Sequence, residues 1–571
     1  MTKHLDDYFP WESFRRLRMT RSLKLVVITA NLVIVAYILR SIPWRGIAFT
    51  PSHFRFNVYQ TIAITANQGH LPVLSQSPSV ANMRISNLDA WPSLVYHPML
   101  WSVLGIETEN MRYAISQWVI SAPLVAGSAT LLVARRFDST PWKCILAFLL
   151  PFFAGQLFFS NTLTGIDQLG HGGSLFIWAI VSIVLIEQSH TPRRWSVITI
   201  LMSTLTLAWR HTAGMVLFIS FSILFLIVSV LPLRRKRQIR ITILAIISIH
   251  LLHSAIVFGF YTSIIGSAFT WLLTFSGSLG RPSSSTNVPG PTNVSFQLSD
   301  FLSFVDRIVI LTIIGVLWAA SLYQLYTLRQ RNETANQADR FILVLAACSL
   351  GILPAAVSFY VYKGLGGVVY RTMQYMTLFG FLAIPTLWVY FERQLHKTIF
   401  GRLHLSSLVV VFAVLLMVIS PVAVITTGTN LGNSNYLTYK EAAATNTLSN
   451  IIPQEDRIAG SYHISPPLAA SHEKVVWVGF QRFSLSEIER VLKGIYYSPT
   501  AQSFPQSITL LEDEYGTVNI LILSNRASGP IGVQSRAQRF STAPVDYIGR
   551  YRKIPAANKI YSNGQVSAFR L

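Results

Sequence analysis

Two acidic residues are candidate general bases or metal ligands, because both lie in polar segments between apolar runs. Asp89 precedes the aromatic segment WPSLVYHP, and Asp167 lies in SNTLTGIDQLGHGG with His171 four residues further on. If a helix starts at Asp167, this spacing puts both side chains on one helical face. Each acid also has a structural interpretation, since Asp89 suits a turn and Asp167 suits a helix cap. The sequence leaves metal use open, with Asp89, Asp167 and His171 as the candidate ligands of a divalent cation such as Mg²⁺ or Mn²⁺.

Two arginines are placed where they could bind a phosphate group. Arg210, in the short turn WRHT, and Arg371, in YKGLGGVVYRTMQY, both lie at the ends of apolar runs. A guanidinium group donates two parallel hydrogen bonds to one phosphate, and the ends of membrane helices lie at the depth of lipid phosphates. The alternative is that both arginines only anchor their helices at the membrane interface.

The elements that must position these residues are membrane helices. The chain has 571 residues, of which 51% are hydrophobic and 12% are charged, whereas about a quarter of the residues in soluble proteins are charged. Runs of about 20 apolar residues, the length that crosses a bilayer, recur along the chain. We predict a polytopic α-helical membrane protein with about eleven transmembrane helices. The predicted spans are residues 23–40, 113–134, 142–159, 172–188, 195–209, 212–233, 241–264, 305–327, 341–362, 373–391 and 406–428.

The formal net charge of +22 is distributed as a membrane-topology signal and not as a binding surface for an anionic polymer. Basic residues cluster in alternate connections, which the positive-inside rule places in the cytoplasm. These clusters are residues 15–21, 135–136, 193–194, 234–240 and 393–402. The N-terminus is then cytoplasmic and, after an odd number of spans, the C-terminal segment lies outside. We therefore predict an integral protein of the plasma membrane, in contact with the lipid bilayer and without a nucleic-acid partner.

Two long segments lie outside the predicted bundle. The connection over residues 41–112 is far longer than most links between neighbouring helices, and long links tend to be functional. Residues 1–428 form a predicted transmembrane domain that carries this long first outer loop. Residues 429–571 lack a spanning run and are predicted to form a small exported α/β domain. We expect helices in YKEAAATNTLSNII and SLSEIERVLKGI, strands in RIAGSY, VVWVGF and VNILILS, and a hairpin at Asn563-Gly564.

Four further acids fall on the predicted outer side, namely Glu107, Glu109, Asp300 and Asp306. We expect the two glutamates to cap a helix or to be solvated. Asp300 and Asp306 begin the eighth span, and Asp306 beside Arg307 suits a helix end.

The combination of one span, a long first outer loop, a short second outer loop with an acid, about eleven spans and an exported domain resembles the GT-C superfamily of membrane glycosyltransferases. Oligosaccharyltransferase catalytic subunits, protein O-mannosyltransferases and lipid A aminoarabinose transferases belong to it. FNVYQTIAITANQGHLP is similar to the family's loop-one helix, and WPSLVYHPMLWSVLG to its Tyr-Pro-Pro element before the second span. The closing KIYSNGQVSAFRL is similar to the end of exported domains in prokaryotic members.

The resemblance implies inverting transfer of a sugar from a polyprenyl-phosphate carrier to an extracytoplasmic glycan, lipid or protein acceptor. It implies catalytic roles for Asp89 and Asp167, as base or metal-holding acid, and donor-phosphate binding by Arg371 and Arg210. The residues then expected to line the substrate pocket are Tyr96, His97, His171 and His211.

The sequence departs from the family pattern just after the first span, where members usually carry an acid. Asn57 stands near that position, and an amide cannot accept a proton as a base. Either Asp89 has taken the role, or Asp167 acts alone, or the protein is not a catalyst. Two rival functions follow: a non-catalytic relative that binds lipid-linked glycan or scaffolds envelope assembly, and a lipid or polysaccharide transporter. Against a transporter stands the absence of paired half-helices or repeats in the sequence.

Overall fold

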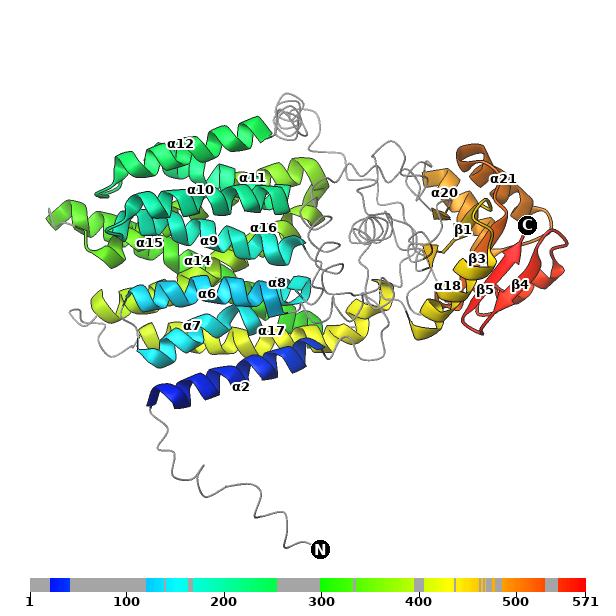
Figure 1. Ribbon diagram of the computed structural model, residues 1–571, viewed down its shortest axis with the longest axis horizontal. Coiled ribbons are helices and arrows are strands. Elements are labelled where there is room, and N and C mark those ends of the chain that lie inside the picture. The colour runs from blue at the N-terminus through cyan, green and yellow to red at the C-terminus, as the bar shows by residue number, and fades with distance from the viewer. Residues whose placement is uncertain are drawn as a thin grey trace, which may run out of the picture.

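The computed structural model contains a helical bundle and a smaller α/β part, joined in sequence by the helix α17 (Figure 1). The bundle lies at one end of Figure 1 and the sheet at the other. The structure describes residues 21–41, 120–137, 140–162, 168–253, 298–331, 335–394, 405–435, 438–461, 464–465, 468, 475–477, 485–528 and 543–571.

Every predicted span coincides at least in part with a helix. The helices of the bundle are α2 (Arg21–Ser41), α6 (Ser121–Arg136), α7 (Pro141–Phe153), α8 (Gln156–Thr162), α9 (Gln168–Gln188), α10 (Pro192–Trp209), α11 (His211–Ile227), α12 (Lys236–His253), α14 (Leu298–Arg331), α15 (Gln337–Ser349), α16 (Ile352–Gln394) and α17 (Leu405–Asn435). Two spans differ from their predictions. Residues 142–159 form two helices with a break between α7 and α8. Residues 341–362 are divided between α15 and α16, and α16 continues as one helix through the predicted outer connection at 362–375 into the next predicted span.

Within the described residues, five helical segments are long and apolar enough to cross a membrane. They are His171–Gln188, Phe301–Gln330, Gln337–Ser358, Arg371–Glu392 and Leu405–Ile425, and the shorter helices Pro141–Phe153 and Thr212–Ile227 are also apolar. Apolar side chains are exposed on the outer faces of the bundle, for example Leu244 on α12 and Val418 on α17. In a membrane such faces contact lipid, because a helix that is apolar all round needs no water-facing side. The total of eleven spans and their direction stay predictions.

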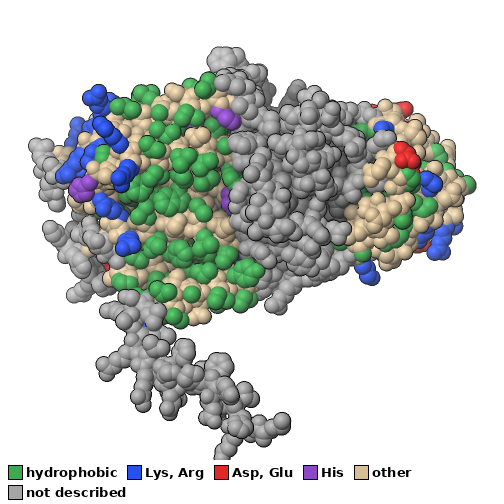
Figure 2. Space-filling view, in the orientation of Figure 1, with side chains coloured by type: hydrophobic (Ala, Val, Ile, Leu, Met, Phe, Trp, Pro, Cys, Tyr) green, Lys and Arg blue, Asp and Glu red, His purple; other side chains and the backbone are tan. Residues whose placement is uncertain are grey.

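The two ends of the bundle differ in charge. Lys and Arg side chains gather at the end that points away from the α/β part (Figure 2). We call this end, where α6 and α9 finish and where α10 and α12 begin, the basic end, and the opposite end the sheet-side end. Exposed cations of the basic end include Arg135, Arg136, Arg193, Arg194 and Arg240. The arrangement matches the alternating charge clusters of the sequence, which places the basic end on the predicted cytoplasmic side.

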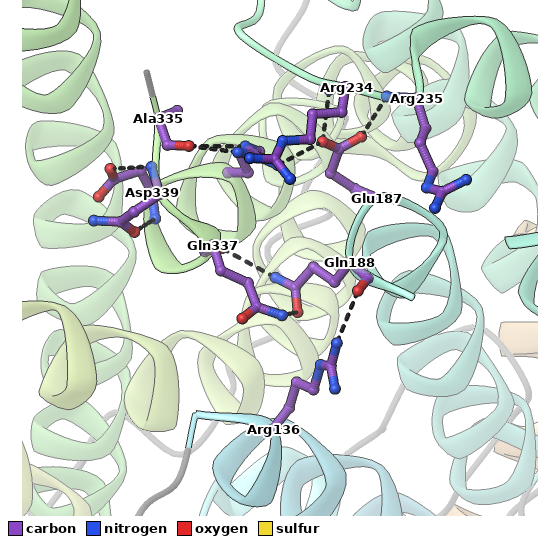
Figure 3. Close-up of polar contacts among 10 residues, drawn as sticks. Arg136, Glu187, Gln188, Arg234, Arg235, Ala335, Gln337 and Asp339 are labelled. Carbon is purple, nitrogen blue, oxygen red and sulfur yellow. Dashed lines mark hydrogen bonds and ion pairs between the residues drawn. The ribbon is translucent and has the colours of Figure 1, made fainter. Parts of the chain in front are cut away.

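A buried carboxylate joins three connections at the basic end (Figure 3). Glu187 accepts hydrogen bonds from the backbone N–H groups of Arg234 (2.6 Å) and Arg235 (2.8 Å). Its Oε1 also accepts from the Arg340 guanidinium at 3.2 Å, and Arg340 donates to the Ala335 carbonyl at 2.6 Å and 3.0 Å. Because a buried charge is costly unless it is paired and hydrogen-bonded, these contacts fix the end of α9 against the starts of α12 and α15.

The α/β part is built on a five-stranded sheet with the order β2-β1-β3-β5-β4. The strands are β1 (Ile458–Gly460), β2 (Val475–Trp477), β3 (Ile520–Ser524), β4 (Asn558–Ser562) and β5 (Val566–Arg570). Strands β2, β1 and β3 are parallel, whereas β3, β5 and β4 are antiparallel. The predicted hairpin is confirmed, since β4 and β5 pair across a turn in which Gly564 has a φ of +84°. That left-handed conformation favours glycine.

The helices of this part are α18 (Tyr439–Ile451), α20 (Leu485–Leu492) and α21 (Ser503–Tyr515). Shorter helical segments are Lys493–Tyr497, Asn525–Ser528 and Gly549–Lys553. The predicted helices over YKEAAATNTLSNII and SLSEIERVLKGI and all predicted strands are confirmed. Helix α17 runs on to Asn435, past residue 428, and the domain boundary drawn there stays a prediction.

Candidate functional site

Several of the predicted site residues lie outside the part of the chain that the structure describes. These are Asp89, Tyr96, His97 and Asp167. Helix α9 begins at Gln168, so Asp167 directly precedes its first residue in the sequence. The backbone of His211 begins α11, but its side chain is outside the described set. The geometry therefore comes from His171, Arg210 and Arg371, whose side chains are described.

Arg210 is the single residue between α10 and α11, which confirms the predicted turn. Its backbone is extended, with φ −155° and ψ 110°. Its N–H donates to the Thr206 carbonyl at 2.8 Å, and its carbonyl accepts from the Gly214 N–H at 3.0 Å. Both backbone groups are thus used by the adjoining helices, and the half-buried side chain is held at the junction of two helices at the sheet-side end.

Tyr375 brings the two predicted phosphate-binding arginines into one cluster. The Arg210 Nε donates to Thr212 Oγ1 at 3.0 Å, and the Tyr375 hydroxyl lies 3.2 Å from the same oxygen. Tyr375 also interacts electrostatically with the guanidinium groups of Arg210 and Arg371. The cluster therefore joins the α10–α11 turn to α16, on which Arg371 and Tyr375 lie four residues apart and so on one helical face.

His171 lies next to this cluster. Its Nε2 is 3.0 Å from the Ser121 hydroxyl at the start of α6, and its ring lies 5.4 Å from that of Trp209. The following residue, Gly172, packs closely on Arg210, because a Cβ atom placed on it would be 3.1 Å from the Arg210 Cβ. The start of α9, which follows Asp167 in the sequence, is thus adjacent to the turn that carries Arg210.

The arrangement suits an anionic ligand. Arg210, Thr212 and Tyr375 contact one another at the sheet-side end, beside the N-terminal end of α11 with its positive dipole, and Arg371 is near enough to interact electrostatically with Tyr375. We name Arg210, Thr212, Arg371 and Tyr375 the arginine cluster. A phosphate could receive charge-assisted hydrogen bonds from both arginines at once.

Asp306 is not a candidate for the general base or metal-holding acid. This carboxylate is 1% exposed and accepts hydrogen bonds from the Gln156 N–H and the Ser420 hydroxyl, so it caps α8 and not the start of its own helix. Among the described residues, no three His, Cys, Asp or Glu side chains are grouped as metal ligands. Asp167, Asp89 and a metal bound to them remain predictions.

Sequence reasoning did not identify Thr212, Tyr375, Ser121 or Trp209. Tyr375 follows Arg371 by four residues, a spacing that shares one face of a helix, but the predicted span begins only at residue 373 and left Arg371 in the connection before it. Thr212 belongs to the turn WRHT, in which the sequence pattern predicted site roles for Arg210 and His211 alone. Ser121 lies 50 residues before His171, and no local pattern predicts a contact over that separation.

Comparison with known proteins was informative for the structure alone. No protein-family model matches the sequence, and no curated protein matches it. The archaeal oligosaccharyltransferase AglB from Archaeoglobus fulgidus, in complex with an inhibitory peptide and a dolichol-phosphate, is similar with a TM-score of 0.53. The identity is 11%, over 87% of this chain and 69% of that one.

ArnT from Cupriavidus metallidurans, bound to undecaprenyl phosphate, is similar with a TM-score of 0.51 and 11% identity, over 95% of this chain and 97% of that one. The Archaeoglobus fulgidus oligosaccharyltransferase in complex with Zn and sulfate gives a TM-score of 0.50 at 9% identity, over 94% and 72% of the two chains. At these identities the likeness establishes the fold and not the activity. The resemblance to GT-C glycosyltransferases is thus confirmed at the level of the fold, and the chain is an integral membrane protein.

Proposed function

We propose that this protein is a membrane glycosyltransferase that moves a sugar from a polyprenyl-phosphate-linked donor to an extracytoplasmic glycan, lipid or protein acceptor. The observation that carries the proposal is the arginine cluster, because it offers two guanidinium groups to one anion at a helix end in a bundle of glycosyltransferase fold. The solved structures of similar fold that contain a dolichol-phosphate and an undecaprenyl phosphate support a lipid-linked donor.

The proposed reaction assigns a separate task to each group. Arg210 and Arg371 bind the donor phosphate and stabilise the negative charge that grows on it as it leaves. A nucleophilic oxygen or nitrogen of the acceptor attacks the anomeric carbon, the bond from that carbon to the phosphate oxygen breaks, and polyprenyl phosphate departs. The acceptor's proton passes to a carboxylate, for which Asp167 is the first candidate and Asp89 the second.

Asp167 is the first candidate because its sequence neighbour α9 packs against the arginine cluster. Tyr96, His97, His171 and His211 are proposed to line the substrate pocket. Asp89, Asp167 and His171 offer the oxygen and nitrogen ligands of a divalent metal, and such an ion would stabilise charge on the donor phosphate.

A non-catalytic role in lipid-linked glycan binding or envelope assembly is the second candidate, and Asn57 in place of the family's early acid favours it. The experiment that separates the two measures transfer by purified protein in proteoliposomes, with a panel of labelled polyprenyl-phosphate sugars and envelope extract as acceptor.

The variants to compare are Asp167→Asn and Asp89→Asn, with Asp513→Asn in α21 as the matched control at a distance from the bundle. We expect one of the two loop variants to lower kcat by about a hundredfold or more, because general base catalysis contributes roughly 10²–10⁴-fold, while the control keeps full activity. Donor binding that persists in every variant, without transfer by the wild type for any sugar tested, would establish the binding role instead.

A further inference from the structure

Two buried charges of opposite sign flank the break between α7 and α8. Arg40, at the end of α2, is fully buried, and Asp306, on α14, is 1% exposed. They come from helices that are distant in sequence from residues 154–155, where the break lies. Charged side chains inside a membrane protein are rare and generally have a function, since leaving water is costly for them.

The break exposes backbone groups that need partners. Pro151 lies inside α7, Ala154 is extended with ψ 157°, and Gly155 has a φ of +74°. The last carbonyls of α7 and the first N–H groups of α8 therefore lack partners within their own helices. Unpaired backbone groups at membrane depth are strongly unfavourable, so a break there persists only where other groups satisfy it.

Arg40 satisfies the α7 side of the break. Its Nε donates to the Phe152 carbonyl at 3.1 Å, and its Nη2 donates to the Pro151 carbonyl at 3.2 Å. Its guanidinium carbon also lies 4.2 Å from the centre of the Phe159 ring, on α8. A cation at this place is favourable electrostatically, because the C-terminal end of a helix carries partial negative charge.

Asp306 satisfies the α8 side. Its two carboxylate oxygens accept from the Gln156 N–H at 3.3 Å and 3.1 Å, and Ser420 on α17 donates to Oδ1 at 2.5 Å. An anion suits the N-terminal end of a helix, where the dipole is positive. The signs of both charges thus match the helix ends that they contact.

The break is also connected to the arginine cluster by close packing. A Cβ atom on Gly155 would lie 2.3 Å from the Thr377 Cγ2, two residues beyond Tyr375 on α16. Phe158 of α8 packs edge-on against Phe381 of α16, with ring centres 5.2 Å apart. Helix α8 is therefore fixed against the helix that carries Arg371, and it ends at Thr162, five residues before Asp167.

We infer that Arg40 and Asp306 are positioning residues, which fix the α7–α8 break and so the direction in which α8 runs beside the helix that carries Arg371. The effect of this positioning on catalysis rests on the proposed function. The position of α8 can be measured whether or not the protein transfers a sugar. Arg40 further joins this break to the start of residues 41–112, since it is the penultimate residue of α2.

The first test measures the position of α8 by pulsed electron–electron double resonance, which gives the distance between two spin labels. The labels are attached at Thr162→Cys and Leu322→Cys in protein whose Cys144 and Cys348 are replaced by alanine. Leu322 is exposed and lies sixteen residues from Asp306 on α14, about 24 Å along the helix at 1.5 Å per residue. Asp306→Asn removes the charge but keeps an acceptor oxygen, and Arg40→Gln removes the charge but keeps a donor. Gly315→Ala on α14 is the control, because its Cβ would meet no atom within 4 Å.

We expect the distance distribution to shift or broaden in Asp306→Asn and Arg40→Gln, to stay as in the wild type in Gly315→Ala, and to recover partly in Arg40→Lys. In the transfer assay, kcat should fall roughly tenfold to a hundredfold, the effect of a misplacement near 1 Å. The KM for the donor should stay within about twofold, because the arginine cluster itself is unchanged.

The inference is overturned if both charge variants give the wild-type distance distribution and an unchanged kcat. If the wild type transfers no sugar, the proposed function fails, and the distance measurement alone decides the inference. Should Asp306→Asn fail to accumulate, Ser420→Ala, which removes one hydrogen bond to the same carboxylate, takes its place with the same expected direction.

Discussion

At the scale of single residues, the arginine cluster shows how far charge and position along the chain can predict a site. Arg210 and Arg371 were identified because they end apolar runs. The structure brings both to Tyr375, although 161 positions separate them in the sequence. Their convergence depends on how α10, α11 and α16 pack, which no local pattern encodes. The acids of the site and the residues Tyr96 and His97 stay predictions.

Replacement of Arg371 should weaken the binding of polyprenyl phosphate. We expect Arg371→Gln to raise the Kd about tenfold to a hundredfold, because a hydrogen bond to a charged group is worth about 1.5–3 kcal/mol and 1.4 kcal/mol corresponds to a tenfold change. Arg371→Lys should recover only part of the affinity, since an ammonium group lacks the planar fork. Binding of labelled polyprenyl phosphate to detergent-solubilised protein measures this, with Arg329→Gln, exposed near the end of α14, as control. Equal affinity in Arg371→Gln and Arg329→Gln would remove Arg371 from the site.

At the scale of elements, most regular helices and strands were predictable, whereas the break between α7 and α8 and the continuity of α16 through residues 362–375 were not. The hairpin at Asn563-Gly564 and the buried strand β3 follow from turn chemistry and apolar runs. The break within LLPFFAGQLFF was not predicted, because Pro and Gly alone do not end a membrane helix. The groups that satisfy it, on Arg40 and Asp306, come from residues more than 100 positions away.

The α/β part should lose stability at alkaline pH through two buried tyrosines. Tyr547 donates to the Ser524 carbonyl at 2.6 Å and Tyr551 to the Ile495 carbonyl at 2.8 Å. Burial raises the pKa of both hydroxyls well above the usual value. The folded state therefore holds these protons more tightly than the unfolded state. Their contribution is complete below pH of about 10 and is lost as the pH rises above it.

The measurement is a joint titration of tyrosinate absorbance and circular dichroism from about pH 8 to about pH 13. We expect the two buried tyrosines to ionise only together with unfolding. Tyr547→Phe should lower the free energy of unfolding by about 1–3 kcal/mol, because the Ser524 carbonyl loses its donor, while Tyr561→Phe, on the half-exposed face of β4, should change it little. Tyrosine ionisation that is complete while the circular dichroism stays native would contradict this account.

At the scale of the whole molecule, the charge asymmetry of the bundle predicts its orientation. The basic end is opposite the α/β part (Figure 2), so the positive-inside rule places the sheet outside the cell. The Glu187 contacts hold the basic end together (Figure 3). We therefore expect the sheet-side end, which carries the arginine cluster, to face the compartment in which the proposed lipid-linked donor would be used.

Single cysteines test this orientation in protein whose native cysteines are replaced by alanine. Val545, which is 87% exposed in the α/β part, and Arg193, exposed at the basic end, are the two positions. We expect a membrane-impermeant maleimide to label Val545→Cys on intact cells and to label Arg193→Cys only after the membrane is opened. Labelling of both positions from one side would require an even number of spans between them, whereas labelling of Arg193→Cys alone on intact cells would require a reversed topology.

The one-residue turn at Arg210 has a consequence for the thermodynamics of donor binding. Both backbone groups of Arg210 are already engaged by the helices beside it, so the ligand does not have to order this part of the chain. Binding elsewhere often loses about 0.5–1.5 kcal/mol for each mobile side chain that becomes immobile. The Arg210 side chain is already held by Thr212, so the proposed donor site would lose less of this entropy on binding. Insertion of a glycine on either side of Arg210 would restore conformational freedom to the turn. We expect calorimetry to show a more unfavourable entropy of donor binding with little change in enthalpy.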